Sequence, residues 1–138
     1  MAQDWICNSE EETAKAGIEI LGNLKFPAII CLYGNLGSGK TVFCRSIIKY
    51  LLNDDAMIVP SPTYTIVQTY DSDEIWHFDL YRLDHPDDIY DIGWEDALTA
   101  KLCLIEWPER LGRLKPENSV DIVFSTLDNG ARHISVKP

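Results

Sequence analysis

The sequence has no long uninterrupted run of apolar residues. None approaches the roughly 18 residues that a helix needs to cross a bilayer, which argues against an integral membrane protein. The first twelve residues are acidic and lack both the basic segment and the apolar segment of a secretory signal. We therefore expect a soluble, cytoplasmic protein that has no association with membranes.

Basic residues are also scarce. Twelve Lys and Arg stand against 22 Asp and Glu, so the net charge is −10. Because nucleic-acid affinity comes largely from clustered Lys and Arg, a phosphate backbone repels such a domain. Six carboxylates and no Lys or Arg occur from Asp84 to Asp96. A solvated face is the simpler interpretation of that segment, and the alternative is a surface for a basic partner or a mobile region near a metal.

The four cysteines, Cys7, Cys31, Cys44 and Cys103, are widely spaced and include no CxxC pair. The spacing typical of metal-ligating cysteines is therefore missing. Three of the four lie in apolar segments, where a thiol behaves as a small hydrophobic group. We expect buried free thiols in a reducing compartment and no thiol enzyme.

The chain length fits one domain, and its patterns predict alternating helices and strands. Ser9 and Glu12 form a capping box for a helix that Gly22 closes. The remaining predicted elements are a buried strand over 26–33, a helix over 42–52, strands over 64–70 and 75–80, a short helix from 85 that Gly93 interrupts, a buried strand over 101–107, and a final hairpin over 120–136 that turns at Asn129-Gly130.

The segment Gly34 to Thr41 matches G-x-x-x-x-G-K-[ST] at every fixed position, between a predicted strand and a predicted helix. Such a loop turns successive backbone N–H groups toward phosphate oxygens, and the helix that follows adds its positive N-terminal end. Its lysine serves the β and γ phosphates, and its threonine hydroxyl serves Mg²⁺. The predicted phosphate-binding residues are Leu36, Gly37, Ser38, Gly39, Lys40 and Thr41.

A nucleoside triphosphate site also needs acidic groups near the cation. Asp79 and Glu106 each end an apolar strand, and ligands of open α/β sheets bind at the carboxyl ends of the strands. A solvated strand terminus is the alternative interpretation of either acid. Five further side chains have ordinary structural interpretations and only a minority chance of contacting nucleotide: Thr63, Thr65, His77, Arg82 and Trp107.

Four segments together resemble the TsaE family of small bacterial ATPases. They are the phosphate loop, Ser61 to Thr65, the heptapeptide His77 to Leu83, and Ile105 to Glu109. They follow the family's order and spacing and span Gly34 to Glu109, about half of the chain. The heptapeptide after a predicted hairpin sets this family apart from other phosphate-loop families.

The resemblance assigns roles to individual residues. It implies that residues 36–41 hold the phosphates of ATP, that Thr41 and Glu106 bind Mg²⁺, and that Asp79 is a second required acid. It makes 61–65 a switch-like element and implies further nucleotide contacts near Glu10 and Arg132. The expected fold is α/β: a single P-loop ATPase domain over residues 1–138, with a mixed, largely parallel central sheet flanked by helices and a C-terminal hairpin.

The resemblance also implies a function. Members of this family are needed to make threonylcarbamoyladenosine in tRNA, and they act on the TsaB–TsaD complex and do not bind tRNA themselves. The expected activity is ATP hydrolysis, slow in the isolated protein and stimulated by the complex, that resets the complex between turnovers. A net charge of −10 agrees with a protein that does not touch tRNA.

Two other functions share parts of this pattern. A small nucleoside or sugar kinase needs a lid that brings several arginines over the phosphates, and this chain has five arginines in total and no long insertion. A nucleotide-dependent binding module, in which hydrolysis is incidental, shares every motif with the ATPase. Turnover in the presence of the partner complex separates the ATPase from the module.

Overall fold

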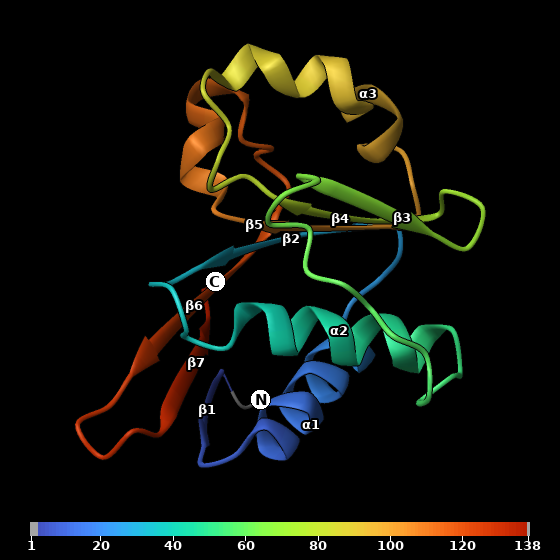
Figure 1. The fold of residues 1–138 in the computed structure, drawn as a ribbon. Helices are drawn as coiled ribbons and strands as arrows, with labels where there is room; N and C mark the ends of the chain where they lie inside the picture. Colours follow the sequence, from blue (N-terminus) through green and yellow to red (C-terminus); the bar gives the residue numbers. More distant parts are fainter. Residues whose placement is uncertain (1–2, 138) are drawn as a thin grey trace.

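The computed structural model describes residues 3–137 and contains a seven-stranded mixed sheet with helices on both faces (Figure 1). The strands lie in the order β1-β7-β6-β2-β5-β4-β3. The elements in chain order are β1 (Asp4–Cys7), α1 (Glu10–Gly22), β2 (Ala28–Tyr33), α2 (Lys40–Leu51), β3 (Val67–Tyr70), β4 (Ile75–Asp79), the 3₁₀ helix η1 (Pro86–Ile92), α3 (Trp94–Ala97), β5 (Leu102–Glu106), the 3₁₀ helix η2 (Pro108–Leu114), β6 (Val120–Thr126) and β7 (Arg132–Val136).

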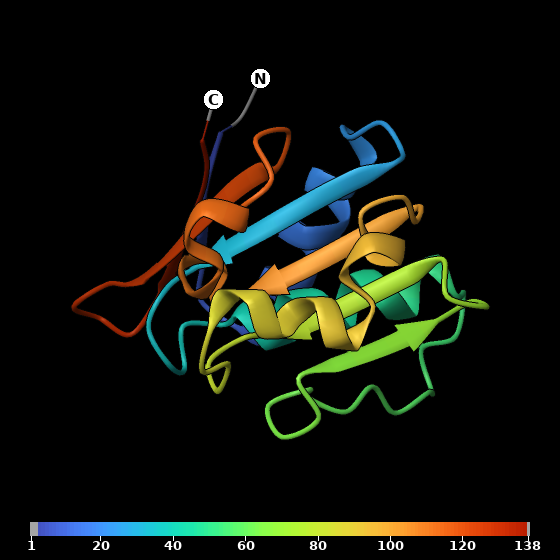
Figure 2. The same ribbon diagram turned by 90° about the horizontal axis from the view of Figure 1, so that it is seen from above.

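The four central strands, β6, β2, β5 and β4, pair in parallel, whereas the pairs at the two edges are antiparallel. Figure 2 shows β2, β5 and β4 pointing the same way and β3 pointing back. Residue Glu106 pairs with Leu32 on one side and with Asp79 on the other. The carboxyl ends of three strands therefore meet at one edge of the sheet, next to the loop that follows β2.

Two apolar clusters fill the spaces above and below the sheet. Helices α1 and α2 cover one face, and η1, α3 and η2 cover the other (Figure 1). Strands β4 and β5 are buried along their whole length, as expected of strands covered on both faces. This sandwich of a sheet between helices confirms the predicted α/β fold with its mixed central sheet and C-terminal hairpin.

The structure differs from the sequence-based expectations at several elements, and the 3₁₀ helix η2 (Pro108–Leu114) was not predicted. Strand β1 was not predicted, because its four residues alternate only weakly and pair with β7 far along the chain. Residues 62–65 form turns, so the strand expected from 64 begins at Val67. The helix expected from 85 is a 3₁₀ helix, and Gly93, with a φ of 94°, separates it from the four-residue α3.

The described chain contains no helix that combines the length and the apolar character needed to cross a membrane.

Candidate functional site

The phosphate loop connects β2 to α2 and takes backbone conformations that suit glycine. Gly37 and Gly39 have φ values of 76° and 104°, in the left-handed region. A Cβ on Gly34 would lie 2.8 Å from the carbonyl oxygen of Phe124, so the close approach of β6 requires glycine there. Helix α2 begins at Lys40 with no side-chain cap, which leaves its first N–H groups available to an anion.

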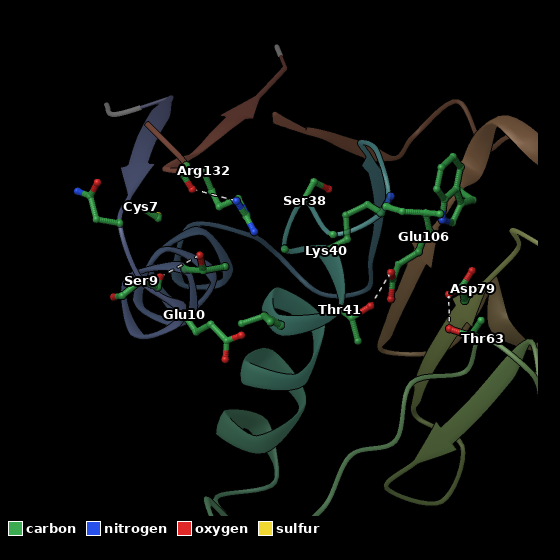
Figure 3. A pocket seen from close by; sticks show the side chains of 18 residues that line it. Cys7, Ser9, Glu10, Ser38, Lys40, Thr41, Thr63, Asp79, Glu106 and Arg132 are labelled. Carbon is green, nitrogen blue, oxygen red and sulfur yellow. Dashed lines mark hydrogen bonds between the residues drawn. The ribbon is translucent and has the colours of Figure 1, made fainter. Parts of the chain in front are cut away.

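The loop borders a cavity of about 360 Å³ (Figure 3). Every site residue expected from the sequence lines this cavity: Leu36, Gly37, Ser38, Gly39, Lys40, Thr41, Asp79, Glu106 and Arg132. Glu10, Thr63 and Trp107 line it too. Of the minority candidates, Thr65, His77 and Arg82 are not among the lining residues. The structure thus gathers segments from residue 7 to residue 132 around one cavity.

Lys40 is only 4% exposed. Its ammonium group donates hydrogen bonds to the carbonyl oxygens of Gly34 and Asn35 and lies 3.9 Å from the ring centroid of Trp107. Trp107 reaches that place from a left-handed backbone, with a φ of 61°, directly after β5. Burial lowers the pKa of Lys40, and the nearby carboxylate of Glu106 opposes that change. The amine is thus held within the loop by these contacts.

The two acids lie side by side because β4 and β5 pair in register, with Asp79 opposite Glu106. Thr41 Oγ1 donates to Glu106 Oε1 at 3.0 Å, so the first turn of α2 is joined to the end of β5. The other carboxylate oxygen, Glu106 Oε2, lies 2.6 Å from His77 Nε2. This contact between His77 and Glu106 was not predicted from the sequence. The only feature that could have indicated it is a polar residue, His77, in the middle of an otherwise apolar strand.

Asp79 is connected to the segment expected to act as a switch. Thr63 Oγ1 donates to Asp79 Oδ2 at 3.1 Å, and the hydroxyls of Ser61 and Thr63 are 2.7 Å apart. The backbone N–H of Tyr81 donates to the remaining oxygen, Asp79 Oδ1, at 3.1 Å. These hydrogen bonds connect Asp79 to residues 61–63, which lie between α2 and β3.

Comparison with known proteins gives this arrangement a family. The family model described as "Threonylcarbamoyl adenosine biosynthesis protein TsaE" matches residues 7–134. The chain belongs to the TsaE family. A TsaE protein from Rickettsia conorii is 44% identical over 131 residues, which cover 94% of this chain and 74% of that protein. The TsaE protein of Aquifex aeolicus is 36% identical, with 99% of this chain and 96% of that protein covered.

A solved structure shares the fold of this TsaE-family chain. The crystal structure of YdiB from Bacillus subtilis superposes with a TM-score of 0.72, covering 96% of this chain and 82% of that one. The sequence identity is 23%, so the likeness concerns the fold alone.

The donor set at the end of β5 fits the magnesium ion that the TsaE family implies. Mg²⁺ prefers oxygen ligands and keeps several waters, so it needs only one or two protein groups beside the phosphates of a nucleotide. The hydroxyl of Thr41 and the carboxylate of Glu106 are such groups, 3.0 Å apart and facing the cavity (Figure 3). Asp79 supplies a second carboxylate on the same edge.

The far half of the cavity is built by the N-terminal end of α1 and by the closing hairpin. Ser9 caps α1 by accepting a hydrogen bond from the N–H of Glu12 at 3.1 Å, as the capping box predicts. Glu10 and Arg132 line this half, where the resemblance expects nucleotide contacts (Figure 3). The guanidinium of Arg132 donates to the carbonyl oxygen of Gly130 at 3.0 Å. The cavity is thus lined by the loop and the acids in one part and by Glu10 and Arg132 in another.

All four cysteines are buried free thiols, as the sequence predicts. Burial raises the pKa of Cys31 to about 11 and that of Cys44 well above its ordinary value. Thiols with a raised pKa are poor nucleophiles because the thiolate is the reactive form. The cysteines therefore belong to the core.

Proposed function

We propose that this chain is a Mg²⁺-dependent ATPase whose hydrolysis of ATP serves the threonylcarbamoyladenosine modification of tRNA. Family membership places the chain in the biosynthesis of that nucleoside. The observation that carries the ATPase proposal is the convergence, in one cavity, of a complete phosphate loop with the Thr41–Glu106 pair and with Asp79.

Each residue has a defined task in this proposal. The backbone of residues 36–41 binds the phosphates through N–H groups, and Lys40 adds a positive charge at the β and γ phosphates. Thr41 and Glu106 hold Mg²⁺, which when bound neutralises the charge that develops on the phosphates. Asp79 accepts a hydrogen bond from the attacking water, on the side where Thr63 already contacts it. Arg132 and Glu10 contact the nucleotide at the far end of the cavity.

The proposed partner is the TsaB–TsaD complex, and tRNA is not bound directly. A net charge of −10 supports this division, because the acidic surface would oppose a phosphate backbone. Hydrolysis, slow alone and stimulated by the complex, resets the complex between turnovers. The connection from Asp79 through Thr63 to Ser61 supplies a route from the phosphate end of the cavity to the surface.

The test is ATP hydrolysis by the purified protein with and without TsaB and TsaD. We expect Mg²⁺-dependent phosphate release that the two partners stimulate and that Glu106→Gln abolishes. Glu95→Gln is the matched control, because Glu95 is an exposed acid on α3 outside the cavity. Tight nucleotide binding without stimulated turnover would favour a binding module. Phosphate transfer to a nucleoside or sugar would favour a kinase.

A second measurement addresses the proposed switch. Segments ordered by the γ-phosphate and Mg²⁺ relax after hydrolysis in many phosphate-loop proteins. We expect a non-hydrolysable ATP analogue to raise the affinity of the chain for TsaB–TsaD above the affinity measured with ADP. By linkage, the complex must then favour ATP over ADP by the same factor. Equal affinities in the two nucleotide states would remove the switch from the mechanism.

A further inference from the structure

We propose that His77 is a positioning residue whose imidazole N–H fixes the carboxylate of Glu106 in the orientation needed to bind the cation. The inference rests on the proposed function, because it concerns the same magnesium site. It assigns a task to a side chain that does not line the cavity and would contact neither nucleotide nor metal.

His77 lies in the middle of the buried strand β4, where packing alone would favour an apolar residue. On the face of the sheet covered by α1 and α2, β4 presents Ile75, His77 and Asp79, since alternate residues of a strand share a face. His77 is opposite Leu104 in the neighbouring strand and has an exposed fraction of 0%. Burying a polar side chain is unfavourable unless it is hydrogen-bonded, so this histidine requires a partner.

That partner is Glu106. A carboxylate oxygen accepts hydrogen bonds, so we assign the hydrogen of the 2.6 Å contact with Glu106 Oε2 to Nε2 of His77. The other ring nitrogen, Nδ1, has no hydrogen-bond partner among residues 3–137. Within the described residues, the imidazole ring therefore hydrogen-bonds only to Glu106.

Glu106 is held at both oxygens, and the two contacts come from two different elements of the fold. Thr41 donates to Oε1 from α2, and His77 donates to Oε2 from β4. Two fixed oxygens determine the plane of the carboxylate and keep Oε1 on the side of Thr41, where the cation would lie. Groups that orient a metal ligand in this way commonly change metal affinity or activity by about 10- to 100-fold when they are removed.

Three variants separate positioning from packing. His77→Gln keeps an N–H donor near the position of Nε2, His77→Asn is too short to place one there, and His77→Leu keeps the volume without any donor. We expect the affinity of the ADP complex for Mn²⁺, measured by electron paramagnetic resonance, to fall about 10- to 100-fold in the Asn and Leu variants and to remain within about threefold in the Gln variant. Binding of ADP without metal should change little in all three.

The control and the choice of ion follow from the structure. His133→Leu removes a second histidine–carboxylate contact, 3.0 Å from Asp4 and outside the cavity, and should leave Mn²⁺ affinity unchanged. Mn²⁺ is preferred to Zn²⁺ as the probe, because Cys44 lies within 4.8 Å of both His77 and Glu106 and a thiol would capture a softer ion.

The outcomes distinguish this inference from the proposed function. Nucleotide-dependent Mn²⁺ binding that is lost with Asn and Leu and kept with Gln supports the positioning role. If the unsubstituted protein binds Mn²⁺ with ADP and the folded Asn variant binds it equally well, His77 has a packing role and the inference is wrong while the proposed function stands. If the unsubstituted protein shows no nucleotide-dependent Mn²⁺ binding, both are overturned.

Discussion

Replacing Lys40 by methionine should separate nucleotide binding from folding. The methionine side chain keeps most of the buried stem of lysine and removes its charge. The ammonium group contacts carbonyl oxygens and the ring of Trp107, and no ion pair within residues 3–137 includes it. Burial lowers the pKa of Lys40, which shows that the folded protein disfavours its charged form.

The expected loss of affinity follows from the contacts that Lys40 would make. Hydrogen bonds that involve a charged group contribute about 1.5–3 kcal/mol each, so one bond to each of two phosphates contributes about 3–6 kcal/mol. That corresponds to a weakening of roughly 10²- to 10⁴-fold for ATP or ADP. The free energy of unfolding without nucleotide should stay within about 1 kcal/mol of the original, because the methionine no longer carries a desolvated charge.

Calorimetric titration with ADP and with a non-hydrolysable ATP analogue measures the first quantity, and urea denaturation without nucleotide measures the second. Lys49→Met is the matched control, because Lys49 lies on the same helix but does not line the cavity. Unchanged nucleotide affinity in a folded Lys40→Met protein would refute the role of this lysine. A loss of more than about 2 kcal/mol of stability would show that Lys40 supports the fold itself.

Three further predictions concern the switch, a tight turn and the buried thiols. Thr63→Val removes the hydroxyl that donates to Asp79 at 3.1 Å. The affinity for TsaB–TsaD should then differ less between the ATP analogue and ADP, while the affinity for ADP itself stays within about threefold. An undiminished difference between the two nucleotides would exclude this contact from the switch. Gly93→Ala places a Cβ 2.6 Å from the indole of Trp76 at a φ of 94°. Urea denaturation should show that the free energy of unfolding falls by about 2–5 kcal/mol. A decrease below about 0.5 kcal/mol would contradict that packing. The pKa of the Cys31 thiol is raised from 9.0 to about 11 in the folded protein. Because only the unfolded chain loses this proton between pH 9 and pH 11, the free energy of unfolding falls as the pH rises through that range, by about 1.4 kcal/mol at pH 10. Denaturation at pH 8 and pH 10 should therefore show a smaller pH effect in Cys31→Ala, and an equal effect would mean that the thiol ionises in the folded protein.

The phosphate loop and the buried strands were predictable because each is encoded by neighbouring residues. The glycines of 34–41 specify backbone conformations within one turn, and the apolar segment over 28–33 specifies a strand covered on both faces. The Asn129-Gly130 pair likewise encodes the closing turn, where Gly130 has a φ of 86°. The TsaE resemblance rested on the phosphate loop and three other local segments, and family membership was confirmed over residues 7–134.

The cation-binding edge was predictable only in outline. The sequence indicated that Asp79 and Glu106 both end buried strands, and their placement at one edge of the sheet follows from parallel pairing. It did not indicate that Trp107 turns its ring over Lys40, because that contact depends on a left-handed residue after β5. Strand β1 was missed for a related reason, since its four residues become a strand only by pairing with β7.

The sequence by itself determined a phosphate loop, a lysine, a threonine and two acids in a fixed order along the chain. Only the tertiary structure decided which atoms meet. Thr41 and Glu106 are 65 residues apart, and His77 and Glu106 are 29 apart, yet both pairs are in hydrogen-bond contact. The physical reason is register: a shift of one residue between β4 and β5 would turn His77 away from Glu106, and no local pattern encodes that alignment.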